Sequence, residues 1–239
     1  MDGAPGFRPL YRQVYDHLVK QISIGVWKAA EALPSEHALA SSLGVSQGTV
    51  RKALDAMASE NLIERRQGKG TYVSQYNEQS ALFRFFRMAH PGGEKVIPDC
   101  GEKSISRRPA NATEVRKLAM KPDETVVELR RTRWVEGRPA IFEIIVLPLA
   151  LFPDIDQHDP LPNALYTLYQ AEFDINIVQA EEELHADIAR KEDASRLDLP
   201  LGSPILQIDR IAIDIAGRPV ELRLSRCDTA RLVYAVSIG

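Results

Sequence analysis

Hydrophobic residues recur every three or four positions through the first sixty residues of the chain, a spacing that places them on one face of a helix. A first helix is predicted from the series Leu10, Val14, Leu18 and Ile22. Gly25 is a residue at which such a helix can end. The chain therefore begins with an amphipathic helix that needs a partner for its apolar face.

A second, shorter helix is predicted within "LPSEHALASSLG". Ser35 is a favourable N-cap, Glu36 falls in the first turn, and Gly44 provides a stop. Its buried face would consist of Leu39 and Leu43. At the usual helical pitch this segment makes about two turns.

A third helix follows the Gly-Val turn, and Ser46 can cap it. One face of this helix is apolar and consists of Val50, Leu54 and Met57. The other face consists of Gln47, Arg51 and Asp55.

The period then changes from helix to strand. Ile63 and the pair Tyr72 and Val73 flank "RRQGKG", whose glycines permit a tight turn between two short strands. Three helices followed by a hairpin predict a winged helix-turn-helix over residues 1–75. Polar "SQYNEQS" is the expected linker, and the aromatic "LFRFF" begins a second core, so residues 76–239 form the second predicted domain.

This second domain contains an internal repeat. "RKLAMKPDETVVELRRTRWVEGRPAIFE" and "SRLDLPLGSPILQIDRIAIDIAGRPVELR" share a helix end, a long strand, a "GRP" turn and a return strand. Leu118 matches Leu197, and Arg131 matches Arg210. Two helix-plus-hairpin units predict a pseudo-symmetric α+β domain around one antiparallel sheet.

Composition and charge narrow the functional classes. The chain is 44% hydrophobic and 26% charged, as in globular proteins, and it has no apolar run long enough to cross a membrane and no secretion signal, so a cytosolic protein is expected. Cys100 and Cys227 are expected to be buried or free thiols, and no metal or cofactor is predicted. Residues 1–75 carry nine Lys or Arg against seven Asp or Glu, whereas the remaining 164 carry 21 against 26. A mildly basic head joined to an acidic body is typical of a small DNA-binding module linked to another domain.

The start of the third helix is the candidate DNA-reading element. A helix N-terminus offers unpaired N–H groups and a partial positive charge to phosphate. Ser46, Gln47 and Thr49 add hydrogen-bonding groups, Gly48 permits close approach of the backbone, and Arg51 lies one turn from Gln47. An ordinary capped surface helix is the alternative. The order of short helix, turn, helix and basic glycine hairpin favours DNA binding.

Residues 10–73 resemble the DNA-binding domain of the GntR family, whose running pattern is "LPSE..LA..LGVS..TVR.AL..L...GLI....G.GTFV". Many members have arginine where this chain has His37 and Gln47. By this resemblance the operator-reading or phosphate-binding positions are His37, Gln47, Gly48, Thr49 and Arg51, and the wing tip consists of Gly68, Lys69, Gly70 and Thr71.

Two arginines share an otherwise apolar strand face in "VVELRRTRWV". Alternation places Arg131 and Arg133 on the side of Val127, Leu129 and Val135. Burial of unpaired arginine is costly, so an anionic partner is expected inside the domain. That partner is either a small ligand or a protein carboxylate, for which Glu143 and Glu182 are the candidates.

The second domain resembles the UTRA ligand-binding domain of the HutC subfamily, a fold related to chorismate lyase. The resemblance rests on "RTRWVEGRPAIFEIIVLP", "LYTLYQAEFDINIVQAEEELHA" and "GSPILQIDRIAIDIAGRPVE". It implies that an anionic effector, either a sugar phosphate or a carboxylate, binds in a pocket made by Arg131, Arg133, Glu143, Tyr166 and Glu221.

The sequence thus predicts a transcriptional regulator, a repressor that binds a double-stranded operator as a homodimer and is released by a small acidic metabolite. Two half-sites would double the contacts that one winged helix can make. The alternative is a lyase-like enzyme that acts on a carboxylate. A winged helix used only for protein contacts is a third possibility, and it would show no salt-dependent DNA binding.

Overall fold

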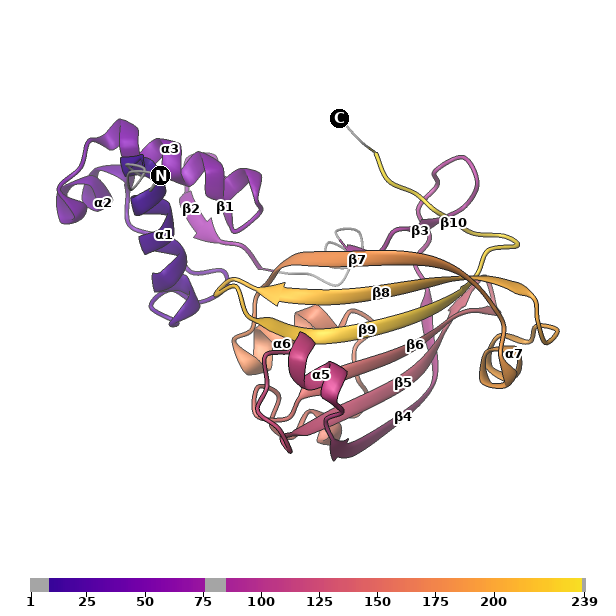
Figure 1. Ribbon diagram of the computed structural model, residues 1–239. Coiled ribbons are helices and arrows are strands. Elements are labelled where there is room, and N and C mark those ends of the chain that lie inside the picture. Colours follow the sequence, from indigo (N-terminus) through magenta and orange to yellow (C-terminus); the bar gives the residue numbers. More distant parts are fainter. Residues whose placement is uncertain (1–8, 76–84, 238–239) are drawn as a thin grey trace, which may run out of the picture.

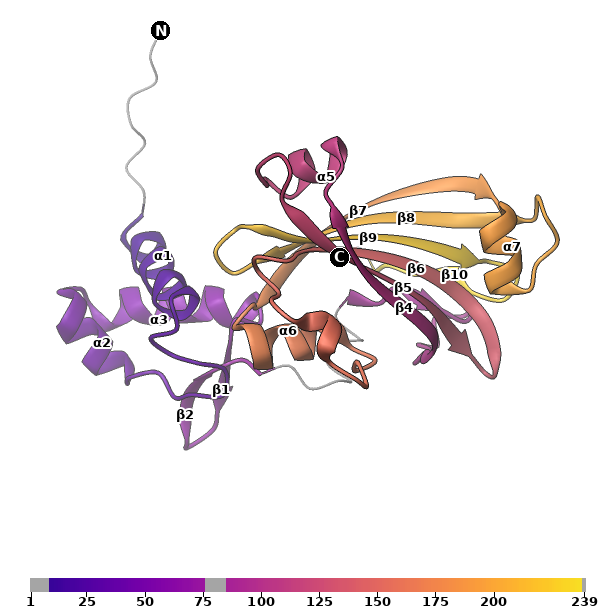
Figure 2. The same ribbon diagram turned by 90° about the horizontal axis from the view of Figure 1, so that it is seen from below.

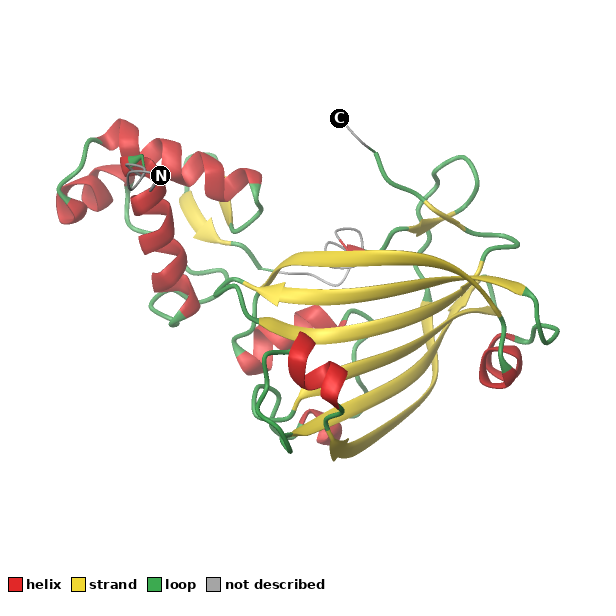
Figure 3. Ribbon diagram, in the orientation of Figure 1, coloured by secondary structure: helices red, strands yellow, loops and turns green. Residues whose placement is uncertain are grey.

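The computed structural model describes residues 9–75 and 85–237, in which a helical head lies beside one end of a long antiparallel sheet (Figures 1 and 3). The predicted linker, residues 74–80, lies outside these residues except for Ser74 and Gln75. The combination of helical head and sheet body confirms the predicted α+β class. None of the helices in the described ranges is long and apolar enough to cross a membrane.

The three predicted helices of the head are confirmed. They are α1 (Leu10–Ser23), α2 (Glu36–Leu43) and α3 (Gln47–Ser59). Ser35 caps α2 by accepting from the Ala38 N–H, and Gly44 ends it in the left-handed conformation that glycine adopts without strain. One face of each helix contributes to the head core, which contains Val14, Leu18, Ile22, Leu39, Val50, Leu54 and Met57.

One position in the first helix was predicted incorrectly. Leu10 belongs to the predicted apolar stripe, yet it is 46% exposed. It is the first residue of α1 and has no part in the head core. The inward face of α1 therefore begins at Val14.

The predicted wing is a two-stranded hairpin of β1 (Ile63–Arg66) and β2 (Gly70–Val73). Gly68 and Gly70 have φ of 70° and 112°, which a side chain would strain. The turn therefore depends on both glycines and carries Lys69 at its tip. Ile63 and Val73 anchor the hairpin in the head core.

The body is a six-stranded antiparallel sheet in the order β4-β5-β6-β9-β8-β7. Its strands are β4 (Asp99–Pro109), β5 (Thr125–Val135), β6 (Arg138–Pro148), β7 (Ile177–Ile188), β8 (Pro204–Asp214) and β9 (Pro219–Asp228). A separate small sheet pairs β3 (Met88–Ala89) with β10 (Val233–Tyr234).

The predicted repeat is visible in this strand order, because β4-β5-β6 is followed by its counterpart β7-β8-β9 in reverse. A helix precedes the hairpin in each half, namely α5 (Ala112–Lys117) and α7 (Lys191–Leu197). The halves meet where β6 pairs with β9, and there the repeat-related residues Ile144 and Leu224 lie opposite each other. A pseudo-twofold axis therefore passes through the centre of the sheet.

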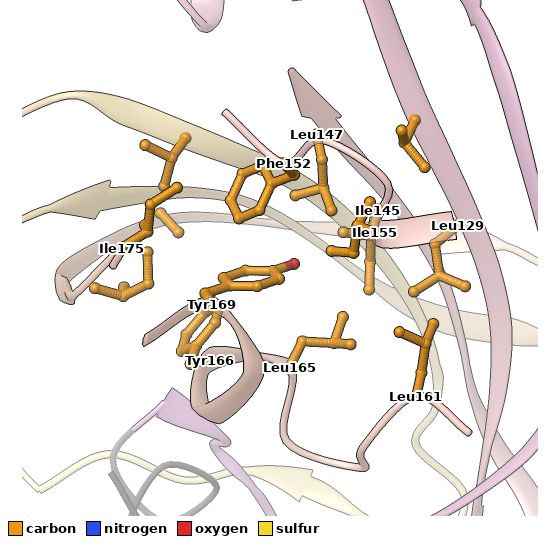
Figure 4. Close-up of a cluster of buried hydrophobic side chains, with 14 of the residues drawn as sticks. Leu129, Ile145, Leu147, Phe152, Ile155, Leu161, Leu165, Tyr166, Tyr169 and Ile175 are labelled. Atoms are coloured by element: carbon orange, nitrogen blue, oxygen red, sulfur yellow. The ribbon is translucent and has the colours of Figure 1, made fainter. Parts of the chain in front are cut away.

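The two faces of the sheet are covered differently (Figure 2). Both α5 and α7 lie over the ends of one face, termed here the outer face. The inner face is covered by α6 (Leu165–Phe173) and by the loop before it, which contains the short helix η1 (Ile155–Gln157). The main core of the body lies between α6 and the sheet and includes Leu129, Ile145, Leu147, Phe152 and Tyr169 (Figure 4).

Candidate nucleic-acid interface and anion pocket

The N-terminus of α3 is open to solvent. Ser46 caps the helix by accepting from the Thr49 N–H at 3.1 Å, and its hydroxyl also contacts the Thr49 hydroxyl at 2.9 Å. Gln47 and Gly48 occupy the exposed first turn. The predicted reading residues are therefore held on one exposed surface, and His37 of α2 is exposed as well.

A carboxylate that the sequence reading did not single out as a site residue organises this surface. Glu36, the first residue of α2, accepts from Arg51 Nε at 3.0 Å and from Gln47 Nε2 at 3.5 Å. Arg65 of the wing approaches the same carboxylate at 3.4 Å. The hydrogen bond from Arg51 lowers the pKa of Glu36, which stays charged at neutral pH. Glu36 thus holds two α3 side chains and one wing side chain together.

The wing tip is exposed at Gly68, Lys69 and Gly70, and Thr71 is half-buried. The Tyr72 hydroxyl donates to the Lys69 carbonyl at 3.1 Å, and the Arg66 guanidinium lies 4.3 Å from the Tyr72 ring centroid. The tip is thereby stiffened without using the Lys69 ammonium group. No ion pair of Lys69 is found among the described residues. Its ammonium group is therefore available for a phosphate contact.

The second candidate site is a cavity between the inner face of the sheet, α6 and the segment Phe85–Met88. It is partly open to solvent, and its side chains leave about 40 Å³ of space for water-sized molecules. Five arginines line it, namely Arg87, Arg131, Arg133, Arg210 and Arg223. Its apolar wall includes Phe85, Phe86, Met88, Ile141 and Ile208. Of the five predicted effector residues, Arg131, Arg133, Glu143 and Tyr166 line the cavity, and Glu221 lies directly behind Tyr166.

Glu143 is the centre of the charge network in this cavity. It is 3% exposed and accepts from Arg131 Nε at 2.6 Å and from Arg223 Nη1 at 3.2 Å. Its distance to Arg133 Nη1 is 3.5 Å. Burial alone would raise the pKa of Glu143, but the three guanidinium groups outweigh it and lower the pKa far below its ordinary value. Glu143 is therefore a permanent anion.

Arg133 is less completely satisfied than Arg131. It is 1% exposed, and its Nε has no hydrogen-bond partner among the described residues. Nη2 donates to Asn163 Oδ1 at 2.7 Å. Burial, followed by the repulsion of Arg131, lowers the pKa of Arg133 to about 9. A buried guanidinium with an unused donor is costly, and an anion beside it would remove that cost.

Behind this pair, α6 contributes two tyrosines to a second buried carboxylate. The hydroxyls of Tyr166 and Tyr169 donate to Glu221 at 3.1 and 2.7 Å. Arg223 donates to the same carboxylate through Nε and Nη2 at 3.0 and 2.9 Å. Burial and the Glu221 charge raise the pKa of Tyr166 to about 12, so its hydroxyl keeps its proton.

The structure adds residues that the sequence reading missed and changes one pairing. Arg223, Arg210 and Asn163 were not predicted to line the cavity. Glu182, a candidate partner for Arg131 and Arg133, instead pairs with Arg210. The reason is register, because β7 lies beside β8 and Glu182 is directly opposite Arg210. The repeat could have indicated Arg223, since it occupies the position in β9 that Glu143 occupies in β6.

The described residues contain no cluster of three or more His, Cys, Asp or Glu side chains that could hold a metal ion. Cys100 and Cys227 are free thiols. Burial raises the pKa of the Cys227 thiol, which keeps it protonated.

Comparison with known families identifies both parts of the chain. Residues 10–73 match the model of the gntR family of bacterial regulatory proteins, and residues 103–232 match the model of the UTRA domain. The chain belongs to the GntR family of bacterial regulatory proteins. The GntR head is the winged helix-turn-helix, and the UTRA domain is the sheet body that contains the arginine-lined cavity. The chain is accordingly a DNA-binding transcriptional regulator.

Relatives share both parts of this GntR protein. The mannosyl-D-glycerate transport/metabolism system repressor MngR of Escherichia coli K12 is 30% identical over 203 residues, which cover 84% of each chain. The HTH-type transcriptional regulator YurK of Bacillus subtilis is 28% identical over 235 residues, covering 96% of this chain and 95% of YurK.

Solved structures share the fold. The C-terminal domain of YurK is 26% identical with a TM-score of 0.53, covering 56% of this chain and 93% of that domain. PhnF from Mycobacterium smegmatis is 17% identical with a TM-score of 0.57, covering 94% of this chain and 99% of PhnF. This second likeness extends over both the GntR head and the UTRA domain.

Proposed function

We propose that this protein is a repressor that binds its operator as a homodimer and is released when a small anion occupies the UTRA pocket. The operator would be read by α3 and the wing, with Gln47, Arg51 and the backbone at Gly48 in the major groove and Lys69 near phosphate. As a regulator of transcription it would act in the cytoplasm, where bacterial DNA lies.

One observation carries the effector proposal, namely the unpartnered Nε of the buried Arg133. A guanidinium can hold a carboxylate or phosphate through two parallel hydrogen bonds, and in one of these arrangements Nε is a donor. The apolar wall of the pocket suits a metabolite with a carbon body as well as a charged group. The name of the relative MngR contains a carboxylated compound, mannosyl-D-glycerate, which supports a carboxylate as one form of the anionic group.

The pocket favours binding over catalysis. Glu143 in the lining and Glu221 behind Tyr166 are both held by arginines, so neither carboxylate is a free general base. The raised pKa values of Tyr166 and Cys227 keep both protonated. We therefore propose that the protein has no enzymatic activity. A screen of candidate carboxylates for turnover tests this, and any product formed at the pocket would contradict it.

The homodimer is proposed to form through the outer face of the sheet. Between α5 and α7 this face bears half-buried apolar side chains around the pseudo-twofold axis, namely Ile144, Ile211, Leu222 and Leu224. Charged residues surround this outer patch, including Arg130 and Asp209. A second copy of the chain would cover this patch, because an operator with two half-sites needs two heads.

The test begins with a duplex selected from random-sequence DNA by the full-length protein. The affinity of the protein for this duplex, measured by fluorescence anisotropy, should fall steeply as the salt concentration rises. Arg51→Ala should cost about 1–3 kcal/mol with relaxed specificity, and Lys69→Ala should lower the salt slope by about one. Unchanged binding by both variants would contradict the proposed interface.

The effector is tested with the same duplex at constant ionic strength. Metabolite carboxylates and sugar phosphates are added in turn, with chloride as the matched control. At least one anion should release wild-type protein and should have little effect on Arg133→Met. Release by a neutral or cationic compound that is insensitive to this substitution would overturn the effector proposal.

A further inference from the structure

The helix that covers the anion pocket also contacts the DNA-binding head. On α6, Tyr166 and Tyr169 face Glu221. Gln170, the next residue, is 7% exposed and donates from Nε2 to the Ser74 carbonyl at 3.1 Å. Ser74 follows strand β2 of the wing directly. A helix of nine residues therefore binds the pocket network and the head at the same time.

Apolar contacts surround this hydrogen bond. Val178 at the start of β7 and Ile215 after β8 pack against the head core. Gln170 also donates to the Asn176 side chain, and the Asn176 carbonyl accepts from the Ile215 N–H at 2.8 Å. Together these groups form a platform on which the head rests, and we refer to it as the head platform.

The pocket and the head platform are joined by continuous contacts. Arg133 and Arg223 both approach Glu143, at 3.5 and 3.2 Å. Arg223 in turn holds Glu221, which accepts from both tyrosines of α6. Gln170 completes the path to the wing. Every guanidinium, carboxylate and phenol along this path is buried.

A second contact ties the other end of the connecting segment to the same pocket. Arg210 donates to the Phe85 carbonyl, and the Phe85 ring meets the Tyr166 ring edge-on at a centroid distance of 5.0 Å. Phe85 is the first described residue after the connection between the domains. Phe85 thus lines the pocket, and Ser74 contacts the helix that covers it; these two residues flank that connection.

We propose that Gln170 is a positioning residue for DNA binding, through which α6 reports occupancy of the pocket to the head. An anion bound to Arg133 competes with Glu143 for guanidinium donors. The hydrogen bonds of Arg223 to Glu143 and Glu221 then rearrange, and the tyrosines of α6 shift with Glu221. The bond from Gln170 to Ser74 then loses its geometry, and the head leaves the platform position that matches the operator half-site. This inference rests on the proposed function, since it assigns a route to the release of the operator by an anion.

The coupling is tested without knowledge of the natural effector by a double-mutant cycle in the full-length protein. Tyr169→Phe removes the hydroxyl that binds Glu221, and Gln170→Leu removes the donor to Ser74 while keeping the side-chain volume. Operator affinity is measured for both single variants and for the double variant. If the two sites act independently, the change in operator affinity of the double variant should equal the product of the two single changes to within about twofold. We expect the effect of Tyr169→Phe to fall by at least about fivefold in the Gln170→Leu background.

Inorganic phosphate is the probe for the second arm, with chloride at equal ionic strength. Gln170→Leu should lose the phosphate-dependent change in operator affinity while keeping phosphate binding in a thermal-shift assay. Gln157→Leu, at an exposed position on η1, is the matched control and should respond like wild type. Hydrogen exchange of residues 61–75 in wild type, with and without phosphate, gives a readout that needs no variant to fold.

The outcomes separate the two proposals. Independent effects in the cycle, or a Gln170→Leu variant that responds to phosphate as wild type does, would overturn the role of Gln170. Unchanged exchange in residues 61–75 when phosphate releases wild type would do so as well. A wild type that ignores every anion but shows coupling in the cycle would retain the role of Gln170 and instead contradict the anionic effector.

Discussion

At the scale of single residues, the pocket separates two arginines that the sequence presents as equivalent. Arg131 makes a 2.6 Å ion pair with Glu143, whereas the Nε of Arg133 has no partner within the described ranges. The first therefore has a structural role in the free protein, and the second keeps a donor available for a ligand. The contacts around Glu143 thus assign stability to Arg131 and recognition to Arg133, two residues apart on β5.

This difference predicts that two matched substitutions affect different properties, namely stability for Arg131 and anion binding for Arg133. Arg131→Met should lower the free energy of unfolding by about 3 kcal/mol, because it breaks a buried ion pair. Arg133→Met should cost only about 1 kcal/mol, since it leaves Asn163 Oδ1 without one donor, but it should abolish anion binding. Urea unfolding and sulfate titration of both variants measure the two quantities. Equal losses of stability would contradict the division of roles.

The pKa of Arg133 gives a pH-dependent prediction. Burial lowers this pKa from 12.5 to about 9. Between these values the unfolded chain binds the proton that the folded chain has released, so this group makes stability rise with pH there. Sulfate affinity should do the reverse and fall about tenfold per pH unit above pH 9, because sulfate binds the protonated form. Calorimetric titration from pH 7 to 10 checks this, and a flat profile would refute it.

At the scale of elements, the first turn of α2 sets the side chains of α3. Glu36→Gln should free Arg51 and Arg65, because a neutral amide no longer attracts both guanidinium groups. We expect discrimination between the selected duplex and random DNA to fall by about 1–2 kcal/mol, with little loss of non-specific affinity. Glu64→Gln is the control, since Glu64 pairs with Arg66 outside this cluster. Competition binding with both duplexes measures the effect, and equal losses in the two variants would count against it.

Element types and the sheet repeat could be predicted from the sequence because they depend on local patterns. Capping by Ser35 and Ser46 and the alternation around Arg131 require only neighbours in the chain. The positions of Asn163 and Glu182 could not be predicted in the same way. Asn163 comes from an irregular loop, and the partner of Glu182 depends on which strand lies beside β7, which no local pattern specifies. The residues that line the pocket could therefore be predicted less completely than the fold, because they depend on which strands are neighbours and in what register.

At the scale of the whole molecule, most apolar side chains of the head pack into the head core, and Leu10, Ile24 and Val26 are exposed exceptions. The outer face of the sheet, whose ends are covered by α5 and α7 (Figure 2), carries the half-buried outer patch between these helices. Apolar patches with a charged rim commonly mark protein interfaces. The fold thus separates DNA reading in the head from the proposed assembly surface on the body.

This separation predicts where the dimer is broken. Residues 76–239 alone should sediment as a dimer at micromolar concentration, and residues 1–75 as a monomer with weak DNA affinity, because a single head makes only half of the operator contacts.

In the full-length protein, Leu224→Lys should yield folded monomers with weakened operator binding, since it places a charge at the centre of the outer patch on both copies. Leu201→Lys, at a turn position that is 66% exposed, should remain dimeric. Sedimentation velocity and circular dichroism distinguish dissociation from unfolding. A monomeric 76–239 fragment would exclude the body as the dimer contact, and a dimeric, folded Leu224→Lys variant would move the contact away from this face.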